Sequence, residues 1–141
     1  MGEIAAIWIK RFKRGPMDAV GEAHAVAGRG LVGNANQGGK RQITLIDEAR
    51  WREVQEEVGK EVAPTARRAN VMLRGVELEK THRKLLRLGE CVIRIYGELR
   101  PCERMGELQE AMKSRWRGGA FGEIIEGGTI RVGDEAEWLE E

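Results

Sequence analysis

The amino-acid sequence predicts a mainly β protein, a barrel that carries about two short helices. Short apolar runs rich in Ile and Val recur along the chain, and each is too short for a buried helix. The 19 glycines are spread between these runs instead of being gathered in one linker, as expected where tight turns join many strands. A sheet that closes on itself has no exposed edges, so these strands favour a barrel.

We expect each of these apolar runs to form a strand. The expected strands cover residues 4–9, 43–46, 71–73, 91–96, 124–125 and 130–132. One segment between them has helical spacing, because Trp51, Val54 and Val58 lie at i, i+3 and i+7. Asp47 precedes this pattern as a candidate N-cap, so a helix is expected over 47–58.

A second segment repeats the helical spacing near the end of the chain. Met105, Leu108 and Met112 lie at i, i+3 and i+7 after Pro101, which predicts a helix over 102–113. Strands and helices do not alternate along the sequence, so a doubly wound fold is not expected.

Length and composition limit the class of protein. The 141 residues have the length of one domain, 1–141, and 41% hydrophobic and 33% charged residues are typical of a globular chain. No apolar run approaches the ~18 residues of a membrane span, and the first residues do not resemble a signal peptide. Two cysteines without framework spacing favour the reducing cytoplasm. A net charge of +1 and a single basic cluster, residues 10–14, do not predict a nucleic-acid partner.

Cys102 is the candidate for chemistry. Pro101 would place it in the first turn of the second helix, where unpaired N–H groups and the helix dipole favour a thiolate. Arg100 and Arg104 add positive charge in the sequence. A reactive thiol and a buried structural thiol both remain open from these residues alone. Cys91 opens an apolar strand and is expected in the core.

Two further segments could hold an anionic ligand. Residues 28–42 (GRGLVGNANQGGKRQ) form a glycine-rich loop whose backbone can approach a ligand, with a flexible hairpin loop as the alternative. The loop is not a P-loop, because Lys40 is followed by Arg41 where Ser or Thr is required. Arg67 and Arg68 precede a strand, where they are either solvated charges or a phosphate clamp.

Several segments match a known pattern when they are taken in order. They are the strand Gly2 to Ile7, GLVGNANQGGKRQITLI (30–46), Arg68 with Asn70, RGVEL (74–78), LLRLGE (85–90), PCERM (101–105) and RGGAFGEIIEGGTIRVGD (117–134). Over nearly the whole chain they resemble small stand-alone members of the MOSC domain family, which is named for its occurrence at the C-terminus of molybdenum cofactor sulfurase.

The resemblance implies a distorted MOSC-type β-barrel with short helices, and Cys102 at the rim of the barrel. It also implies that Cys102 carries a persulfide sulfur or ligates molybdenum, with Arg68 and Asn70 at the molybdenum cofactor, molybdopterin. Asn34 and Asn36 stand where the family has Asp and His, which keeps hydrogen bonding but removes proton transfer from that loop. The residues expected to bind the cofactor are Arg68, Asn70, Asn34, Arg41, Gly38 and Gly39.

The implied function is reduction of N-hydroxylated compounds at a cysteine-ligated molybdenum. The electrons would come from a separate reductase, because the sequence has neither the cysteine set of an iron–sulfur cluster nor a flavin fingerprint. A sulfur carrier or transferase is the first alternative, with a Cys102 persulfide that serves the assembly of a metal–sulfur centre. A non-catalytic cofactor-binding module is the second. Pyridoxal phosphate is not expected on this chain.

Overall fold

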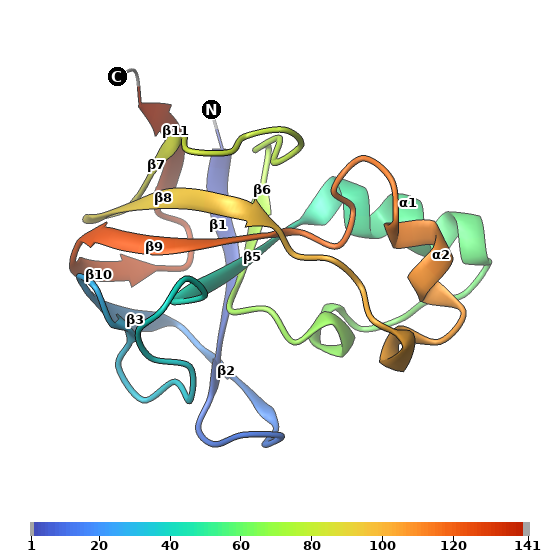
Figure 1. Ribbon diagram of the computed structural model, residues 1–141, viewed down its shortest axis with the longest axis horizontal. Coiled ribbons are helices and arrows are strands. Elements are labelled where there is room, and N and C mark those ends of the chain that lie inside the picture. Colours follow the sequence, from blue (N-terminus) through green and yellow to red (C-terminus); the bar gives the residue numbers. More distant parts are fainter. Residues whose placement is uncertain (1, 140–141) are drawn as a thin grey trace.

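The computed structural model describes residues 2–139 and shows a mainly β fold, as predicted (Figure 1). The strands are β1 (Gly2–Lys10), β2 (Met17–Val20), β3 (Glu22–Val26), β4 (Gly30–Leu31), β5 (Ile43–Asp47), β6 (Val71–Arg74), β7 (Leu85–Leu88), β8 (Cys91–Glu98), β9 (Ala120–Glu126), β10 (Gly128–Arg131) and β11 (Glu135–Leu139). The helices are α1 (Glu48–Val58) and α2 (Leu108–Met112), with 3₁₀ turns η1 (Pro64–Arg67) and η2 (Glu103–Met105).

Seven strands close the predicted barrel, in the spatial order β11, β7, β8, β9, β5, β6 and β1. The ring closes where Gly2 and Glu3 of β1 pair with Ala136 and Glu135 of β11. β2 extends the sheet beyond β1, while β10, β3 and β4 form a small second sheet. β5 and β6 run parallel, and the connection between them carries α1 and η1, because parallel strands need a long crossover.

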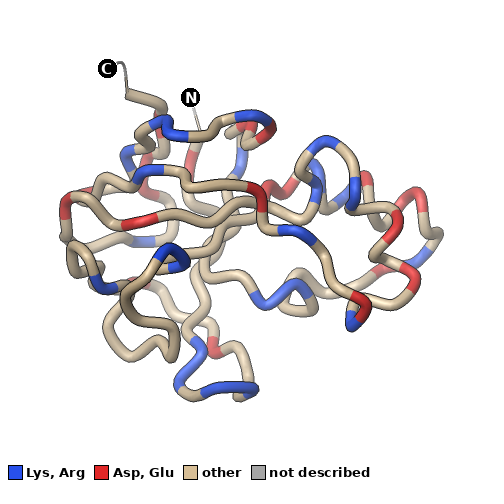
Figure 2. The backbone as a smooth tube through the Cα atoms, viewed as in Figure 1, with Lys and Arg blue, Asp and Glu red and all other residues tan. Residues whose placement is uncertain are grey.

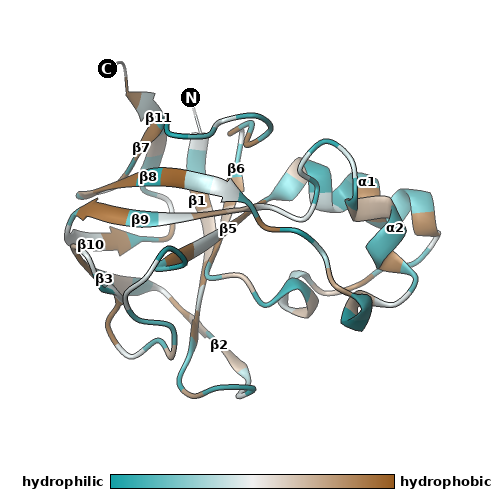
Figure 3. Ribbon diagram, in the orientation of Figure 1, coloured by the Kyte–Doolittle hydropathy of each residue, from teal (hydrophilic) through white to brown (hydrophobic). Residues whose placement is uncertain are grey.

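Apolar side chains fill the interior of the barrel. From Ile93 to Tyr96 of β8, the buried side chains of Ile93 and Ile95 alternate with the exposed ones of Arg94 and Tyr96, whereas Cys91 and Val92 at the start of the strand are both buried. Figure 3 shows hydrophobic residues on the barrel strands β8 and β9 and on β10 of the second sheet. Burial is the largest influence on the Cys91 thiol and raises its pKa to about 12. The expectation that Cys91 belongs to the core is confirmed.

Cys91→Ser is expected to lower the free energy of unfolding by about 1–3 kcal/mol, because it places a hydroxyl among apolar side chains. Urea unfolding measures this change. Cys91→Ala is the matched control, since it removes the sulfur without adding a polar group. Equal stability of the serine and alanine variants would contradict the prediction.

The first predicted helix is confirmed and its ends have physical causes. The side chain of Asp47 accepts a hydrogen bond from Ala49 N at 2.9 Å and caps the N-terminus of α1. Gly59 ends the helix in the left-handed conformation, with φ of 79°, and its N–H donates to Gln55 O. Both signals are local, which is why they could be recognised in the sequence.

The second predicted helix, 102–113, is wrong as one continuous element. The structure has the short turn η2 and the short helix α2, separated at Gly106, whose φ of 58° and ψ of −129° are accessible to glycine. Met105, Leu108 and Met112 nevertheless face one apolar cluster. Their spacing therefore reports a shared packing surface instead of an uninterrupted helix.

That apolar cluster joins α1 to α2 beside the barrel (Figure 1). Its buried members are Trp51, Val54, Leu108, Ala111 and Met112. The indole Nε1 of Trp51 donates to Val62 O at 3.0 Å, so the segment after α1 is held on the same cluster. The two helices therefore form a unit that anchors the chain that follows the Cys102 segment.

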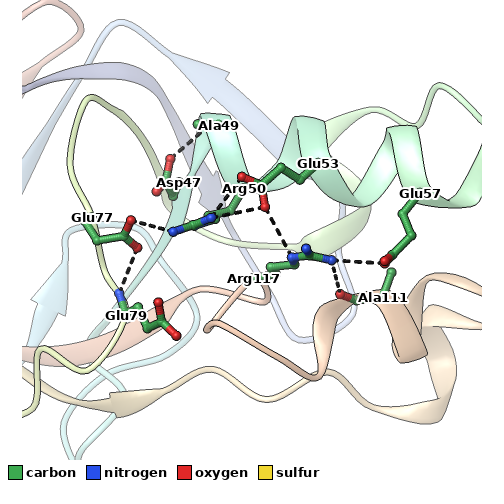
Figure 4. A network of polar contacts seen from close by, with 9 residues as sticks. All are labelled: Asp47, Ala49, Arg50, Glu53, Glu57, Glu77, Glu79, Ala111 and Arg117. Carbon is green, nitrogen blue, oxygen red and sulfur yellow. Dashed lines mark hydrogen bonds and ion pairs between the residues drawn. The ribbon is translucent and has the colours of Figure 1, made fainter.

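A polar network reinforces this unit (Figure 4). Arg50 on α1 pairs with Glu53 at 2.9 Å and with Glu77 at 2.6 Å. Arg117 pairs with Glu53 at 3.4 Å and donates to Ala111 O on α2 at 3.1 Å. The side chains of Arg50 and Arg117 are only 12% and 14% exposed, so water screens these pairs less than ordinary surface pairs. The network fixes the chain immediately before Gly118.

Candidate functional site

A pocket of about 300 Å³ lies between the end of β1, the glycine-rich loop, η1 and the segment that follows β8. Its lining includes five residues that were predicted from the sequence: Asn34, Arg41, Arg68, Asn70 and Cys102. Gly38 and Gly39 are not among the lining residues, and the N–H of Gly38 already donates to Arg29 O at 2.6 Å. The fold therefore brings most of the predicted residues to one place, although they come from three separate segments of the sequence.

Cys102 lies in the segment that leaves β8, and its thiol is exposed. Its backbone is extended, with φ of −112° and ψ of 171°, and its carbonyl accepts from Met105 N at 2.9 Å. The prediction that a long helix begins at Cys102 is wrong, and a three-residue 3₁₀ turn supplies little dipole.

Arg67 was considered in the sequence only as one of two adjacent arginines that could clamp a phosphate, and it was not among the residues expected to bind the cofactor. It is only 9% exposed and lines the pocket together with Cys102. Its Nε donates to Gly118 O at 2.7 Å and its Nη2 donates to Leu99 O at 2.5 Å. Burial is the largest influence and lowers the pKa of Arg67, whereas a thiolate at Cys102 acts in the opposite direction. Both hydrogen bonds go to neutral carbonyls, so the cation keeps its full charge toward the pocket.

Arg68, the arginine expected from the resemblance, has a different environment. It is exposed and adopts the left-handed conformation, with φ of 60° and ψ of 36°. Its Nη2 donates to the carbonyl of Gly15 in the β1–β2 loop. Arg68 lines the outer part of the site and ties it to this loop, while Arg67 points inward.

Two buried amides form a wall of the pocket. The Oδ1 of Asn34 accepts from Lys10 N at 2.9 Å and from the Nδ2 of Asn70 at 3.1 Å. The Oδ1 of Asn70 in turn accepts from Thr44 N at 3.2 Å. Asn34 and Asn70 therefore join β1, the glycine-rich loop and β5. An aspartate at position 34 could accept the same bonds but would bring a negative charge into the pocket.

Every charged residue that lines the pocket is basic, namely Lys10, Arg41, Arg67, Arg68 and Arg104. Burial is the largest influence and lowers the pKa of Lys10, and Arg68 and Arg41 lower it further by repulsion. Figure 2 shows Lys and Arg on η1 and on the adjacent β1–β2 loop. These cations repel one another, and the described residues of the lining include no carboxylate. The pocket therefore favours binding of an anion.

A family model for the MOSC domain matches residues 23–137. The chain belongs to the MOSC domain family. The match covers every pocket residue except Lys10, so the site lies almost wholly within the recognised MOSC domain. The sequence resemblance is thereby confirmed.

Solved structures share the fold of this MOSC domain. YuaD from Bacillus subtilis has a TM-score of 0.82 at 18% identity, over 96% of this chain and 94% of that chain. YiiM from Geobacillus stearothermophilus has a TM-score of 0.76 at 16% identity, over 99% of this chain and 76% of that chain. YiiM from Escherichia coli has a TM-score of 0.73 at 17% identity, over 100% and 71%. Comparison with curated proteins finds no match.

Residues 2–139 of this MOSC domain contain neither a membrane-spanning helix nor a cluster of ionisable metal ligands. No helix among them is long and apolar enough to cross a membrane. No group of three or more His, Cys, Asp or Glu residues in the same range could hold a metal ion.

Phosphate is expected to raise the melting temperature of the MOSC domain more than chloride does at equal ionic strength. An anion that binds only the folded state at 100 times its Kd adds ~2.7 kcal/mol of stability. Arg41→Gln is expected to reduce the shift, because Arg41 is exposed at the pocket and its loss disturbs little packing. Arg52→Gln on α1, outside this pocket, is the matched control. Equal shifts in both variants would contradict an anion site here.

Proposed function

We propose that the pocket of Cys102 binds the molybdenum cofactor and that the protein reduces N-hydroxylated compounds at a molybdenum ligated by Cys102. The observation that carries this proposal is an exposed thiol in a pocket whose charged lining is entirely basic. Membership of the MOSC family supports it, because MOSC domains are associated with this cofactor. The protein is proposed to act in the cytoplasm.

The chemistry of the residues fits such a cofactor. Molybdopterin carries a phosphate, which guanidinium groups recognise, and it supplies sulfur ligands to its metal. When bound, the cofactor supplies the redox-active metal that accepts an oxygen atom from the substrate. Arg67, Arg41 and Lys10 hold negative charge in the pocket, and Cys102 offers a soft ligand at its edge.

The other residues of the site orient these groups. Asn34 and Asn70 use their amides to fix the wall beside Lys10, and two carbonyls fix the guanidinium of Arg67. The two cysteines of residues 2–139, the exposed Cys102 and the buried Cys91, do not form the four-cysteine set that an iron–sulfur cluster requires. The electrons are therefore proposed to come from a separate reductase.

Metal analysis tests this proposal. The full-length protein is purified from a host that makes molybdopterin and, as a control, from a host that does not. We expect stoichiometric molybdenum in the first preparation and none in the second, together with reduction of an N-hydroxylated compound by reduced viologen dye. Protein from the competent host that holds no molybdenum would contradict the proposal.

A sulfur carrier is the second candidate, and the exposure of Cys102 favours it. The thiol lies on a surface segment, where another protein can reach a sulfur atom bound to it. We propose in this case that Cys102 holds a persulfide for the assembly of a metal–sulfur centre. Cyanide-labile sulfur in protein that holds no metal supports this function, and its absence from metal-free protein contradicts it.

A further inference from the structure

Arg67 presents an unusual energetic problem in the described part of the chain. It is nine-tenths buried, yet its hydrogen bonds go to the carbonyls of Gly118 and Leu99 and not to a carboxylate. A buried cation is costly unless negative charge compensates it. Two groups act against this cost, the thiol of Cys102 first and the carboxylate of Glu98 after it, and of these two only Cys102 lines the pocket.

One thiolate does not balance the cations of this pocket. Arg41 and Arg104 line it as well, and Arg41 is held over the ring of Phe121 at 5.0 Å from the centroid. A ligand with more than one negative charge would be held by several guanidinium groups while it faces the sulfur of Cys102. The site therefore fits a small anion that reacts with a thiolate.

A thiolate normally repels an anionic reagent, and a negatively charged leaving group is harder to expel without nearby cations. Fixed guanidinium groups reduce the repulsion and stabilise charge that develops on the leaving group. We propose that Cys102 takes the outer sulfur of a sulfane-sulfur oxoanion, the class to which thiosulfate belongs, and that Arg67 and Arg41 hold the oxoanion. This inference rests on the sulfur-carrier function and names the donor for it.

The step balances without any other reactant. The sulfur of the Cys102 thiolate forms a bond to the outer sulfur of thiosulfate, and the bond from that atom to the sulfonyl sulfur breaks. The electron pair of the broken bond leaves with sulfite, and Cys102 becomes a persulfide anion. Cyanide then removes the outer sulfur as thiocyanate and restores the thiolate, so no oxidant or reductant is consumed.

The same hydrogen bonds hold the guanidinium of Arg67 and the segment that leads to Cys102. Arg67 binds Leu99 O, three residues before Cys102, and Gly118 O, one residue after the network of Arg117. A Cβ added to Gly118 would lie 2.5 Å from Leu99 O and 3.1 Å from the Nη2 of Arg67. The close approach of these segments therefore requires glycine, and it places the guanidinium against the chain that carries the thiol.

The experiment uses full-length protein from a host that cannot make molybdopterin. The protein is incubated with thiosulfate and then cyanide, and thiocyanate is measured. We expect turnover by the unaltered protein, none by Cys102→Ser, and a loss of about 10-fold or more in Arg67→Met and in Arg41→Gln. Arg52→Gln, outside the pocket, is expected to match the unaltered protein. Because Arg41 is exposed, its variant stays informative even if Arg67→Met does not fold.

Two sulfur donors of different charge show whether Arg41 acts through the negative charge of the donor. Methanethiosulfonate carries one negative charge and thiosulfate carries two, so Arg41→Gln is expected to slow the reaction of thiosulfate more. Thiocyanate formation no faster than that of Cys102→Ser, or equal rates in Arg41→Gln and the unaltered protein, would overturn the proposal. Protein that holds cyanide-labile sulfur when purified but does not react with either donor would also overturn it, while the carrier function itself would stand.

Discussion

Cys102→Ser is expected to abolish the binding of molybdenum or of cyanide-labile sulfur while the protein stays folded. A serine hydroxyl is a hard ligand that remains protonated at neutral pH, whereas a thiolate is a soft ligand and a nucleophile. The loss should exceed the about 10- to 100-fold that removal of an outer-shell partner of a metal costs. The exposed position of Cys102 leaves the core untouched, so the melting temperature is expected to change little.

Metal analysis, cyanide-labile sulfur and thermal unfolding together check this result. Cys91 is present in the unaltered protein and in Cys102→Ser, so the variant gives the background signal of a thiol buried in the core. Cys102→Ser protein that is folded and still holds wild-type amounts of molybdenum or sulfur would show that the thiol is not the ligand.

Arg67→Met is expected to have the second largest effect, and Arg68→Met a much smaller one. The first change leaves the carbonyls of Leu99 and Gly118 without their donor, at a cost of about 1–3 kcal/mol each, and removes the inward-facing cation of the pocket. Arg68 is exposed and its side chain donates only to the carbonyl of Gly15. Urea unfolding and the phosphate-induced shift in melting temperature measure the two effects.

Two further variants test whether the contacts of Arg67 are the cause. Arg67→Lys keeps the charge but lacks the planar fork that binds two carbonyls, so an intermediate loss is expected. Gly118→Ala disturbs the same contact from the other side, because the new Cβ would crowd Leu99 O. Similar losses in Arg67→Met and Arg68→Met would contradict an inward role that belongs to Arg67 alone.

Local patterns in the sequence predicted the long strands and the first helix. The apolar run 4–9 became β1, and the cap at Asp47 marks the start of α1 within one residue. The strands β2, β3, β4 and β11 were not predicted, because MDAV, EAHAV, GL and EAEWL are too short or too polar to stand out. β7 was not among the predicted apolar runs either, and its residues entered only through the segment LLRLGE of the family resemblance. The helix over 102–113 failed because two separate turns share one apolar cluster across Gly106.

The site could be predicted in part because its motif residues are recognisable without the fold. The sequence could not predict that Arg67, and not its neighbour Arg68, faces into the pocket. This depends on the 3₁₀ turn η1 and on the left-handed backbone at Arg68. Lys10 belonged to a basic cluster that was considered only as a weak signal for nucleic-acid binding, yet the end of β1 places it in the pocket. These positions arise from contacts between distant segments, which no local pattern records.

The closure of the barrel by β1 and β11 determines where a tag, a surface or a fused protein joined to either end of the chain would lie relative to the pocket. β1 begins at that closure with Gly2 and ends at the pocket with Lys10, so it spans about 30 Å. The two ends of the described chain leave the barrel close together and away from η1 and η2 (Figure 1). A tag, a surface or a fused electron donor joined at either end would leave the mouth of the pocket clear, and a fused donor would need a linker long enough to pass around the barrel to reach Cys102.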